Sequence, residues 1–452
     1  MANALPVNFL NSLRSVKGFN EEALIKAHEN DKLPVSVRLN PNKRTELKFE
    51  LDGSVPWTSD AYYLKDRPVF TADPLFHAGC YYVQEASSMF VEHVLKQTID
   101  LSSDLFALDL CAAPGGKTTI LSSLLSKESV LVANEVIKSR ADILSYNLAK
   151  WGNCNHIVTN SETSSFSDVN GLFDVVLVDA PCSGSGLFRK QPDAINEWSE
   201  EAVLKCGDRQ QKILSDILPS LKTDGVLVYS TCSYSVQENE EIVKWMLENN
   251  DVELVQIKMD AAWGIEDTGL GYRFYPYNLQ GEGFFCAVFR VLDNRSEFHL
   301  KQKGNLKEAT KGEMEIILPF LNVDFEFKVI NHQGDYKLLN NKTLHLLNAL
   351  KNTLYLKQVG SSLGEIKQGD LVPHHFLALS NYTNTGIERF ELNDNEAIKY
   401  LKKENFDHSH STTGLKLITH KNFGIGWAKV LNNRANNYLP QNYMIINKEI
   451  GL

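Results

Sequence analysis

The chain has 452 residues, of which 43% are hydrophobic and 23% are charged, a balance typical of globular domains. This composition excludes a disordered, collagenous or coiled-coil chain, and no apolar run approaches the ~20 residues of a membrane span. The net charge of −10, from 46 basic and 56 acidic residues, is the opposite of what a nucleic-acid-binding protein usually carries.

Cysteine usage and the N-terminal sequence bear on the cellular compartment. Seven cysteines are an odd and small number for this length, so we expect no disulfide framework. No group of Cys and His residues has the spacing of zinc ligands, and we expect no metal. The first six residues lack the basic region and apolar core of a secretory signal. We therefore expect a cytoplasmic protein that does not contact membranes.

The first 292 residues divide into two predicted parts. Residues 1–90 lack a regular alternation of strands and helices, and we expect a small α+β extension there. Residues 91–292 alternate short apolar runs with helical patterns, which predicts an α/β fold with a doubly wound sheet. The β-branched centre of residues 174–179 indicates a strand buried on both faces. The predicted strands are 106–110, 130–134, 156–158, 174–179, 226–229, 252–257 and 284–291, and the predicted helices are 118–125, 138–151, 202–221 and 240–248.

The rest of the chain differs in composition and charge. Residues 293–312 are polar and predict a linker; a small connecting module (313–365) and a mostly-β module (366–452) follow. Residues 1–292 carry 26 basic and 39 acidic residues, whereas residues 293–452 carry 20 and 17. Between 411 and 448 there are five basic residues and no acidic one. This excess is either a face for an anionic ligand or a chance fluctuation of the surface.

The loop after the first predicted strand is rich in small residues. Its end, Gly116-Lys117-Thr118, fits a phosphate-binding loop, but Cys111 stands where the first glycine of that motif is required, which disfavours an NTPase. What remains is a tight turn at a helix N-terminus, where backbone N–H groups can bind a carboxylate. We therefore predict that this loop binds a cofactor through Cys111, Ala112, Ala113, Pro114, Gly115, Gly116 and Lys117.

The next strand ends at an acidic residue. In an open α/β sheet ligands bind beyond the carboxyl ends of the strands, where Glu135 is placed to accept the hydroxyls of a ribose. Taken alone, Glu135 is better explained as a neighbour of a helix N-cap. A ligand that has both a carboxylate and a ribose suggests S-adenosylmethionine.

Two thiols follow two neighbouring strands at the same edge. Singly, Cys182 and Cys232 are better explained as small buried residues, but their pairing beside a methyl donor suggests cytosine chemistry. A thiolate that adds to carbon 6 makes carbon 5 enamine-like, so that carbon 5 can attack a sulfonium methyl group. Asp179 near ring N3 would offset the developing charge, and a nearby Lys117 would lower the pKa of a thiol. The second cysteine suits removal of the carbon 5 proton.

Several blocks resemble the signature motifs of the Nol/Nop/Sun family of RNA 5-methylcytosine methyltransferases. The resemblance covers residues 35–292, and residues 424–429 and 436–440 resemble the PUA-like tail of family members that act on bacterial small-subunit ribosomal RNA. The matching blocks before the tail are 37–41, 84–89, 109–119, 179–186, 229–233 and 281–285.

The resemblance implies a fold and a set of roles. The fold would be a class I (Rossmann-like) methyltransferase sheet with a small N-terminal α+β extension and a C-terminal PUA-like, mostly-β module. Cys232 would be the covalent nucleophile, Cys182 would assist release, and Asp179 would lie between cofactor and cytosine with Lys117 beside it. Glu162 would lie near the adenine, at a position where the family usually has Asp.

The implied activity is methyl transfer from S-adenosylmethionine to carbon 5 of a cytosine in RNA, most simply 16S ribosomal RNA. Two alternatives stay open: a transfer RNA substrate, and a non-catalytic ribosome-assembly factor. We expect the protein to be a monomer. The expected RNA contacts are phosphate contacts by Arg38, Arg189, Lys190 and Arg273, and contacts in the tail by Trp427, Lys429, Arg434 and Tyr438. Taken singly, Arg38, Arg189, Lys190 and Arg273 are better explained as ordinary surface charges. Trp427 is equally well explained as a core residue.

Overall fold

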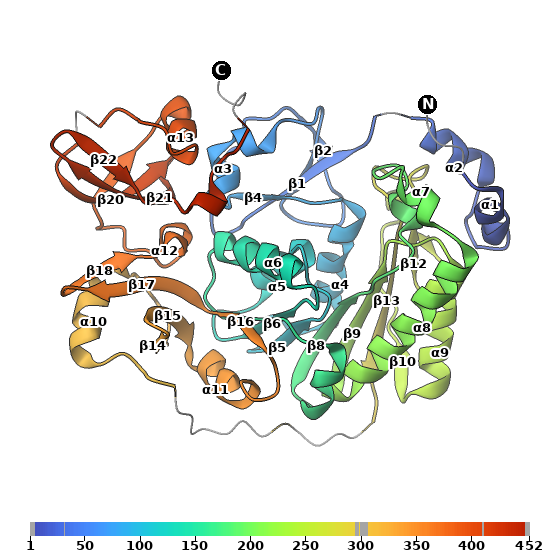
Figure 1. Ribbon diagram of the computed structural model, residues 1–452. Helices are drawn as coiled ribbons and strands as arrows, with labels where there is room; N and C mark the ends of the chain where they lie inside the picture. The colour runs from blue at the N-terminus through green and yellow to red at the C-terminus, as the bar shows by residue number, and fades with distance from the viewer. Residues whose placement is uncertain (1–4, 31, 294–297, 299–305, 409–410, 448–452) are drawn as a thin grey trace.

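The computed structural model describes residues 5–30, 32–293, 298, 306–408 and 411–447, and all structural statements below refer to these residues. They form four β-sheets (Figure 1). Most of the predicted linker, residues 293–312, lies outside the described residues. No helix in the described ranges is long and apolar enough to cross a membrane.

The largest sheet has ten strands and occupies the middle of the chain. Five parallel strands lie in the order β9-β8-β5-β6-β7, β13 adds to β9 antiparallel, and β16 adds to β7 antiparallel. The sheet continues beyond β13 through β12 to β11, and β10 also pairs with β13. The strands are β5 (Phe106–Asp109), β6 (Val130–Asn134), β7 (His156–Thr159), β8 (Phe173–Asp179), β9 (Leu221–Thr231), β10 (Val252–Leu254), β11 (Glu266–Asp267), β12 (Tyr272–Phe274), β13 (Phe284–Val291) and β16 (Leu356–Val359).

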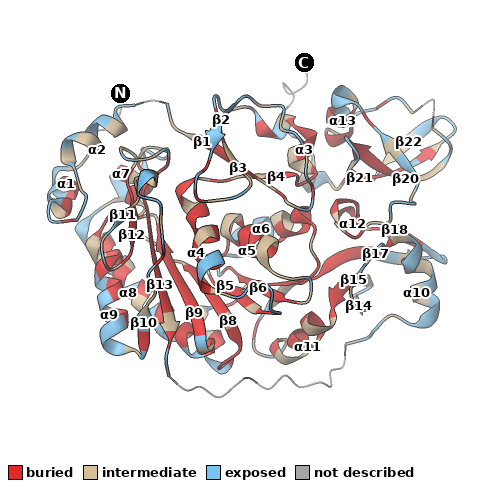
Figure 2. Cartoon of the chain, turned by 180° about the vertical axis from the view of Figure 1, so that it is seen from behind, coloured by how far each residue is buried: buried red, intermediate tan, exposed pale blue. Residues whose placement is uncertain are grey.

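Alternate residues of the parallel strands face opposite layers of helices. Leu108 and Val176 pack with residues of α8 and α9 on one face, while Ala107 and Val175 pack with α4 and α5 on the other. The sheet is accordingly buried on both faces (Figure 2), which confirms the predicted α/β fold with a doubly wound sheet. The helices are α4 (Phe90–Thr98), α5 (Gly116–Leu124), α6 (Lys138–Trp151), α7 (Ala194–Glu197), α8 (Glu200–Ile217) and α9 (Glu240–Asn249).

Some elements differ from the prediction for local reasons. The helix predicted to reach residue 221 ends at Ile217, because Pro219 has no N–H to continue the hydrogen-bond ladder. Strand β9 starts at Leu221, five residues before its predicted start. Strands β11, β12 and β16 were not predicted, since β11 has two residues and three of the four residues of β16 are half-buried, with no alternating pattern.

The N-terminal extension and the tail each contain a four-stranded sheet, and they share one apolar core. Leu75 and Tyr81 of the extension belong to the same cluster as Tyr400 and Ile418 of the tail, and α3 contacts α13 (Figure 1). The extension consists of α1 (Val7–Leu13), α2 (Glu21–His28), β1 (Val35–Leu39), β2 (Leu51–Ser54), β3 (Ala61–Leu64), α3 (Pro74–His77) and β4 (Tyr81–Val83). The tail consists of β19 (Arg389–Glu391), α13 (Asp394–Leu401), β20 (Gly414–His420), β21 (Phe423–Leu431) and β22 (Arg434–Asn437).

The region between the central sheet and the tail forms the fourth sheet, in the order β14-β15-β17-β18. Its chain also supplies β16, which lies at the edge of the central sheet beside β7. The region is thereby attached to the central domain by backbone hydrogen bonds. Its elements are α10 (Lys311–Ile317), β14 (Phe327–His332), β15 (Asp335–Asn340), α11 (Asn341–Leu350), β17 (Ser361–Lys367), β18 (Asp370–Pro373) and α12 (His375–Leu379).

Candidate active site

The loop between β5 and α5 is held from both ends. Thr118 at the start of α5 donates hydrogen bonds from Oγ1 to Asp109 Oδ2 (2.7 Å) and to the Ala112 carbonyl (3.2 Å). From α6, Arg140 Nη2 donates to the Ala113 carbonyl (2.7 Å) and Asn147 Nδ2 to the Pro114 carbonyl (2.8 Å). The loop therefore has one fixed shape, with the first N–H groups of α5 at its end.

Gly115 supplies the backbone conformation that the turn needs. Its φ of +112° lies in the region that side chains disfavour, and a Cβ there would lie 3.4 Å from Leu144 of α6. A residue with a side chain would strain the turn. The glycine-rich sequence is thus explained by the turn itself.

A cavity of about 290 Å³ opens beside this loop. Its walls include Cys111 and Lys117 from the loop, Asp179 and Cys232 from the ends of β8 and β9, and the Phe284 ring of β13. Residues predicted from three separate loops therefore meet at one site, as the position of the strand ends requires.

Asp109 gives the cavity an unpaired acceptor. Its Oδ1 atom is buried without a hydrogen-bond partner among the described residues, although Asp109 lines the cavity. Burial raises the pKa of Asp109 to about 7, and the hydrogen bond from Thr118 opposes this shift. An amine bound in the cavity would donate a hydrogen bond to this oxygen. The unpaired acceptor therefore fits a cofactor that carries an ammonium group.

Lys117 and Asp179 form an ion pair at the centre of the site. The Nζ–Oδ2 distance is 2.7 Å, Ser230 Oγ donates to the other carboxylate oxygen at 2.8 Å, and Lys117 Nζ lies 5.2 Å from the centroid of the Phe284 ring. Burial lowers the pKa of Lys117, but the charge and hydrogen bond of Asp179 outweigh it and raise the pKa above its ordinary value. Lys117 is therefore a fixed cation.

The two predicted thiols are in contact. Cys182 Sγ and Cys232 Sγ lie 3.0 Å apart, and both cysteines are free and half-buried. The hydrogen bond with Cys232 and burial together hold the pKa of Cys182 well above its ordinary value. The Cys182 thiol is therefore protonated at neutral pH.

A buried carboxylate holds the two cysteine loops together. Glu238 accepts hydrogen bonds from the Ser183 backbone N–H (2.7 Å), from the Ser183 hydroxyl (2.5 Å) and from the Ser233 hydroxyl. Gln210 of α8 donates to Glu238 (3.4 Å) and to the Pro181 carbonyl (3.0 Å). Since Ser183 follows Cys182 and Ser233 follows Cys232, Glu238 fixes the spacing of the two thiols from behind.

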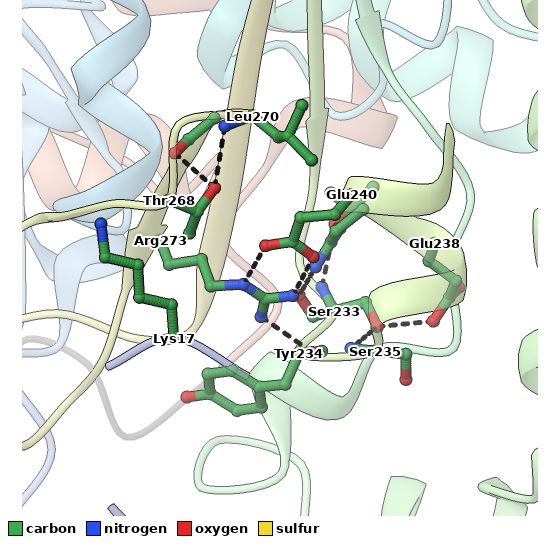
Figure 3. A network of polar contacts seen from close by, with 12 residues as sticks. Lys17, Ser233, Tyr234, Ser235, Glu238, Glu240, Thr268, Leu270 and Arg273 are labelled. Carbon is green, nitrogen blue, oxygen red and sulfur yellow. Dashed lines mark hydrogen bonds and ion pairs between the residues drawn. The ribbon is translucent and has the colours of Figure 1, made fainter. Parts of the chain in front are cut away.

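A second buried pair supports the same region from the side of β12 (Figure 3). Arg273 donates from Nε to Glu240 Oε1 (2.6 Å), from Nη2 to Glu240 Oε2 (2.5 Å) and from Nη1 to the Tyr234 carbonyl (2.8 Å). Such two-pronged pairing is geometrically specific. Arg273, expected as an RNA contact, is 1% exposed and holds the segment after Cys232.

Two glycines let the loops approach each other closely. A Cβ on Gly186 would lie 2.5 Å from the Gly283 carbonyl and 2.7 Å from the Cys232 carbonyl. These contacts are with backbone atoms, which cannot rotate away. Gly186 N–H instead donates to the Cys232 carbonyl (2.8 Å), and Gly283 N–H donates to the Gly186 carbonyl (3.1 Å).

The two predicted acidic cofactor contacts lie away from the cavity walls. The buried Glu135 carboxylate accepts from the Ile137 N–H (2.9 Å) and lies 3.3 Å from Arg140 Nη1. Glu162 is exposed just before a 3₁₀ turn, after the end of β7. Both residues remain on the carboxyl edge of the sheet, where the prediction placed them.

The structure does not bring the predicted RNA contacts together. Arg38 is buried and bonds to Gln84 (3.1 Å) and Thr119 (2.5 Å), and the Trp427 indole N–H donates to the His374 carbonyl (3.0 Å) in a core. The side chain of Arg189 is 6% exposed and lies 3.5 Å from Glu282. The remaining four are on the surface or partly so: Lys190 is half-buried, and Lys429, Arg434 and Tyr438 are exposed.

Sequence reasoning missed several residues of the site. Asp109, Gln84 and Glu85 line the cavity, and the sequence offered a signal for each, because Asp109 ends a predicted strand and the other two lie in the 84–89 block. Glu238 had no such signal, since it lies outside the matching blocks and a sequence does not distinguish a buried carboxylate from a surface charge.

Family models and relatives match nearly the whole chain. A model described as 16S rRNA methyltransferase RsmB/F matches residues 96–290, one for the N-terminal domain of 16S rRNA methyltransferase RsmF matches 5–86, and one for the methyltransferase RsmF PUA domain matches 388–445. Two curated relatives, each named ribosomal RNA small subunit methyltransferase F, come from Shewanella woodyi (30% identity; 90% of this chain and 89% of the relative) and Aeromonas salmonicida (30%; 93% and 90%).

A solved structure agrees in fold. The crystal structure of a methyltransferase homolog protein from Pyrococcus horikoshii is 29% identical and covers 64% of this chain and all of that one, with a TM-score of 0.52. The fold and the site thus define a methyltransferase with a Rossmann-like sheet and a C-terminal PUA domain. Within this class, the chain belongs to the ribosomal RNA small subunit methyltransferase F family. The predicted family and class I fold are confirmed.

Proposed function

We propose that this protein transfers a methyl group from S-adenosylmethionine to carbon 5 of a cytosine in small-subunit ribosomal RNA, through a covalent bond between Cys232 and carbon 6. The observation that carries the proposal is the contact between Cys182 Sγ and Cys232 Sγ at 3.0 Å, beside a cavity that contains the Lys117–Asp179 pair. A single buried thiol is most simply a packing residue, whereas contact between two thiols, one of them in the cavity wall, supports a reactive pair.

The cofactor fits the cavity by its charges. The ammonium group of S-adenosylmethionine would meet the unpaired Asp109 oxygen, and its carboxylate would meet the loop of residues 111–117 at the start of α5. Bound there, S-adenosylmethionine supplies an electrophilic methyl group. We propose ribose contacts for Glu135 and an adenine contact for Glu162 from their places at the same edge.

The first chemical step belongs to Cys232. The thiolate adds to carbon 6 of the cytosine, and carbon 5 gains the electron density it needs to attack the methyl group. The charge of Cys232 contributes to the raised pKa of Lys117, so the ammonium of Lys117 stabilises a thiolate there. Asp179, which Lys117 and Ser230 hold in place, faces the ring nitrogen where charge develops.

The second step releases the product. Cys182 first loses its own proton to solvent, and its thiolate then removes the proton from carbon 5. The electron pair of that C–H bond forms the double bond between carbons 5 and 6 as the bond to Cys232 breaks, and Cys232 leaves as a thiolate. The raised pKa of Cys182 makes it a strong base once its own proton has left. Release therefore quickens as pH rises toward that pKa, and the covalent adduct accumulates as pH falls.

The remaining parts would recruit RNA. We propose that residues 1–90 and 91–292 form the extension and the catalytic domain, that 293–312 link them to a connecting module at 313–365, and that 366–452 form the RNA-binding module. The tail's exposed cations Lys429 and Arg434 are the best placed of the predicted contacts. A ribosomal substrate implies a cytoplasmic enzyme, and the single intact site implies that a monomer suffices.

The decisive test replaces each thiol separately. We expect Cys232→Ala to abolish methyl transfer to small-subunit RNA and Cys182→Ala to trap a protein–RNA adduct on a denaturing gel. Cys154→Ala, which removes a buried free thiol outside the cavity walls, is the matched control and should retain activity. Turnover by Cys232→Ala would refute the nucleophile, and an adduct with Cys232→Ala alone would reverse the two roles.

The substrate is tested in the native host. Bisulfite sequencing compares total RNA from the host with and without the gene. Without the gene, one cytosine in small-subunit ribosomal RNA should lose its methyl group. Loss of a methyl group from transfer RNA instead would make transfer RNA the substrate. No lost mark, in a host that expresses the gene and has no second enzyme for the site, would favour an assembly factor.

A further inference from the structure

A second and larger cavity lies against α6. Its volume is about 920 Å³, three times that of the cavity beside the cysteines, and the proposed methyl transfer does not use it. We name it the α6 pocket and define it by six of its lining residues, Ser145, Tyr146, Lys351, Lys357, Gln358 and Tyr443. These residues come from α6, from the segment that follows α11, from β16 and from the C-terminal end of the described chain.

One wall of the α6 pocket is aromatic. The rings of Tyr146 and Tyr443 stack with centroids 4.2 Å apart and an angle of 10° between their planes. Phe376 lies 5.8 Å from Tyr443, and the His374 ring lies 4.6 Å from Phe376. All four residues line the pocket, and both tyrosines are only half-buried. Tyr443 also stacks with His375 (5.4 Å, 26°), and Lys150 Nζ lies 5.4 Å from the centroid of the Tyr146 ring. A flat ligand ring would therefore pack against the half-exposed edges of this wall, in the tilted or edge-on arrangements that aromatic rings favour.

The pocket also carries a surplus of positive charge. Lys337 pairs with Asp335 (2.5 Å) and Lys357 pairs with Asp142 (2.6 Å), so these four side chains balance. Lys351, the residue that caps α11 at its C-terminal end, has no ion-pair partner among the residues that the structure describes. The pocket therefore combines a stacking surface with one uncompensated cation, which is the chemistry that recognises a base and its phosphate.

A buried polar atom also faces this site without a partner. Ser145 is 8% exposed and lines the pocket, and its Oγ makes no hydrogen bond within the described part of the chain. Gln358 adds an amide to the same wall. A ligand that is apolar throughout would leave the hydroxyl unsatisfied, whereas the edge of a nucleobase offers both donors and acceptors.

The pocket is close to the proposed catalytic site. One side of α6 contacts the cofactor loop through Arg140 and Asn147, and Asp142 and Tyr146 of the same helix line the pocket. The two cavities are therefore about one helix diameter apart, roughly 10 Å. Across the sheet, β16 is four strands from β8, or about 19 Å. A strand of a few unpaired nucleotides is long enough to span either distance.

We propose that the α6 pocket binds one unpaired nucleotide of the RNA substrate, with its base on the Tyr146–Tyr443 wall and its phosphate at Lys351. This inference rests on the proposed RNA methyltransferase function and assigns a second contact point to the same strand. The chemistry it requires is that of a nucleotide, which a free mononucleotide shares, so the test separates the two sources.

The test measures RNA binding by the full-length chain without cofactor, with in vitro-transcribed small-subunit RNA of the host as the probe. We expect Lys351→Glu and Tyr443→Ala each to weaken binding about tenfold. Tyr443→Phe keeps the ring, and Lys244→Glu makes the same charge change on the exposed side of α9. Both controls should stay within twofold of the unmodified chain. Ultraviolet cross-linking should attach RNA to the peptides that contain Tyr146 or Tyr443.

Lys351→Glu decides the outcome if Tyr443→Ala loosens the tail, because the change at Lys351 breaks no ion pair with any residue that the structure describes. Unchanged RNA affinity in Lys351→Glu, or cross-links confined to other peptides, would overturn the proposal. Saturable binding of the four free nucleoside monophosphates, lost in Tyr443→Ala while RNA binding persists, would assign the pocket to a free nucleotide instead and would also overturn it. Methyl transfer by the unmodified chain is measured in parallel. RNA binding without transfer refutes the proposed function, whereas transfer with unchanged variant affinities refutes the pocket alone.

Discussion

The predicted functional residues come together in the cysteine loops but do not come together in the tail sheet. At the ends of β8 and β9, the predicted side chains converge, with Lys117 2.7 Å from Asp179 and the two thiols 3.0 Å apart. In the tail, Trp427 is 1% exposed in a core, while Lys429, two residues later on β21, is exposed. The ends of parallel strands lie at one edge of a sheet whatever the details of packing. Trp427 and Lys429 share one face of β21, so their difference in exposure depends on what covers each position along that face.

The largest effect should come from the carboxylate behind the cysteine loops. Glu238→Ala leaves the Ser183 N–H and two hydroxyls without their acceptor, and we expect a loss of about 4 kcal/mol of folding free energy together with loss of methyl transfer. Glu238→Gln keeps one oxygen acceptor and should lose less than half as much. Denaturant unfolding measures both. A loss below about 1 kcal/mol in Glu238→Ala would show that the loops hold their spacing without it.

The second effect tests the tail side of the comparison. Trp427→Ala removes a buried indole and its hydrogen bond to the His374 carbonyl, and we expect a destabilisation of about 3 kcal/mol. At a temperature where the variant is folded, cofactor affinity should match that of the unmodified chain. Calorimetric melting and cofactor titration check the two parts. A Trp427→Ala variant that is as stable as the unmodified chain but binds RNA poorly would show that Trp427 contacts RNA.

A smaller effect concerns pH in the cofactor cavity. Asp109 has a pKa of about 7, so it is mostly protonated at pH 6 and mostly ionised at pH 8. Since the ionised form attracts an ammonium group, cofactor affinity should rise by up to about tenfold between these values. The Asp109→Asn variant should bind the cofactor weakly at both pH values. Equal affinities of the unmodified chain at pH 6 and pH 8, measured by calorimetry, would remove Asp109 from the cofactor site.

The same carboxyl group affects folding in the opposite direction. A raised pKa means that the folded chain keeps a proton that the unfolded chain has already released. Without cofactor, this contribution to stability is complete below the ordinary carboxyl pKa of about 4 and is lost as pH rises through about 7. Asp109→Asn should abolish this part of the pH dependence of denaturant unfolding.

The smallest effects belong to the exposed cations of the tail. Lys429→Ala and Arg434→Ala should each weaken RNA binding severalfold and reduce the slope of log affinity against log salt concentration by about one. Folding free energy should change by no more than about 0.5 kcal/mol, because neither side chain is buried. Salt slopes identical to that of the unmodified chain would place the RNA elsewhere on the tail.

Much of the central domain was predictable from sequence, for physical reasons that did not extend to the rest. Apolar runs such as residues 174–179 specify buried parallel strands, and the strand ends then bring Cys182, Cys232 and Lys117 together. Strand β16 could not be predicted, because its residues are half-buried and its partner β7 lies about 200 positions earlier in the chain. Long-range packing decides such a strand, and local sequence carries no trace of it.

The buried arginines illustrate the same limit. Arg38, Arg189 and Arg273 have the sequence context of RNA contacts, yet each lies against a carboxylate, a hydroxyl or a carbonyl in the interior. A sequence shows the charge of a residue but not its partner. Glu240, the partner of Arg273, is 33 positions away.

The shared core of the extension and the tail has a consequence for synthesis. Leu75 and Tyr81 precede the central sheet in the sequence, whereas their packing partners Tyr400 and Ile418 follow it and leave the ribosome later. The central sheet has by then emerged in full, since domains fold as units during synthesis from the N-terminal end. The extension can therefore complete its core only after the tail has been translated. A chain that ends before residue 400 would leave the apolar surface around Leu75 and Tyr81 exposed.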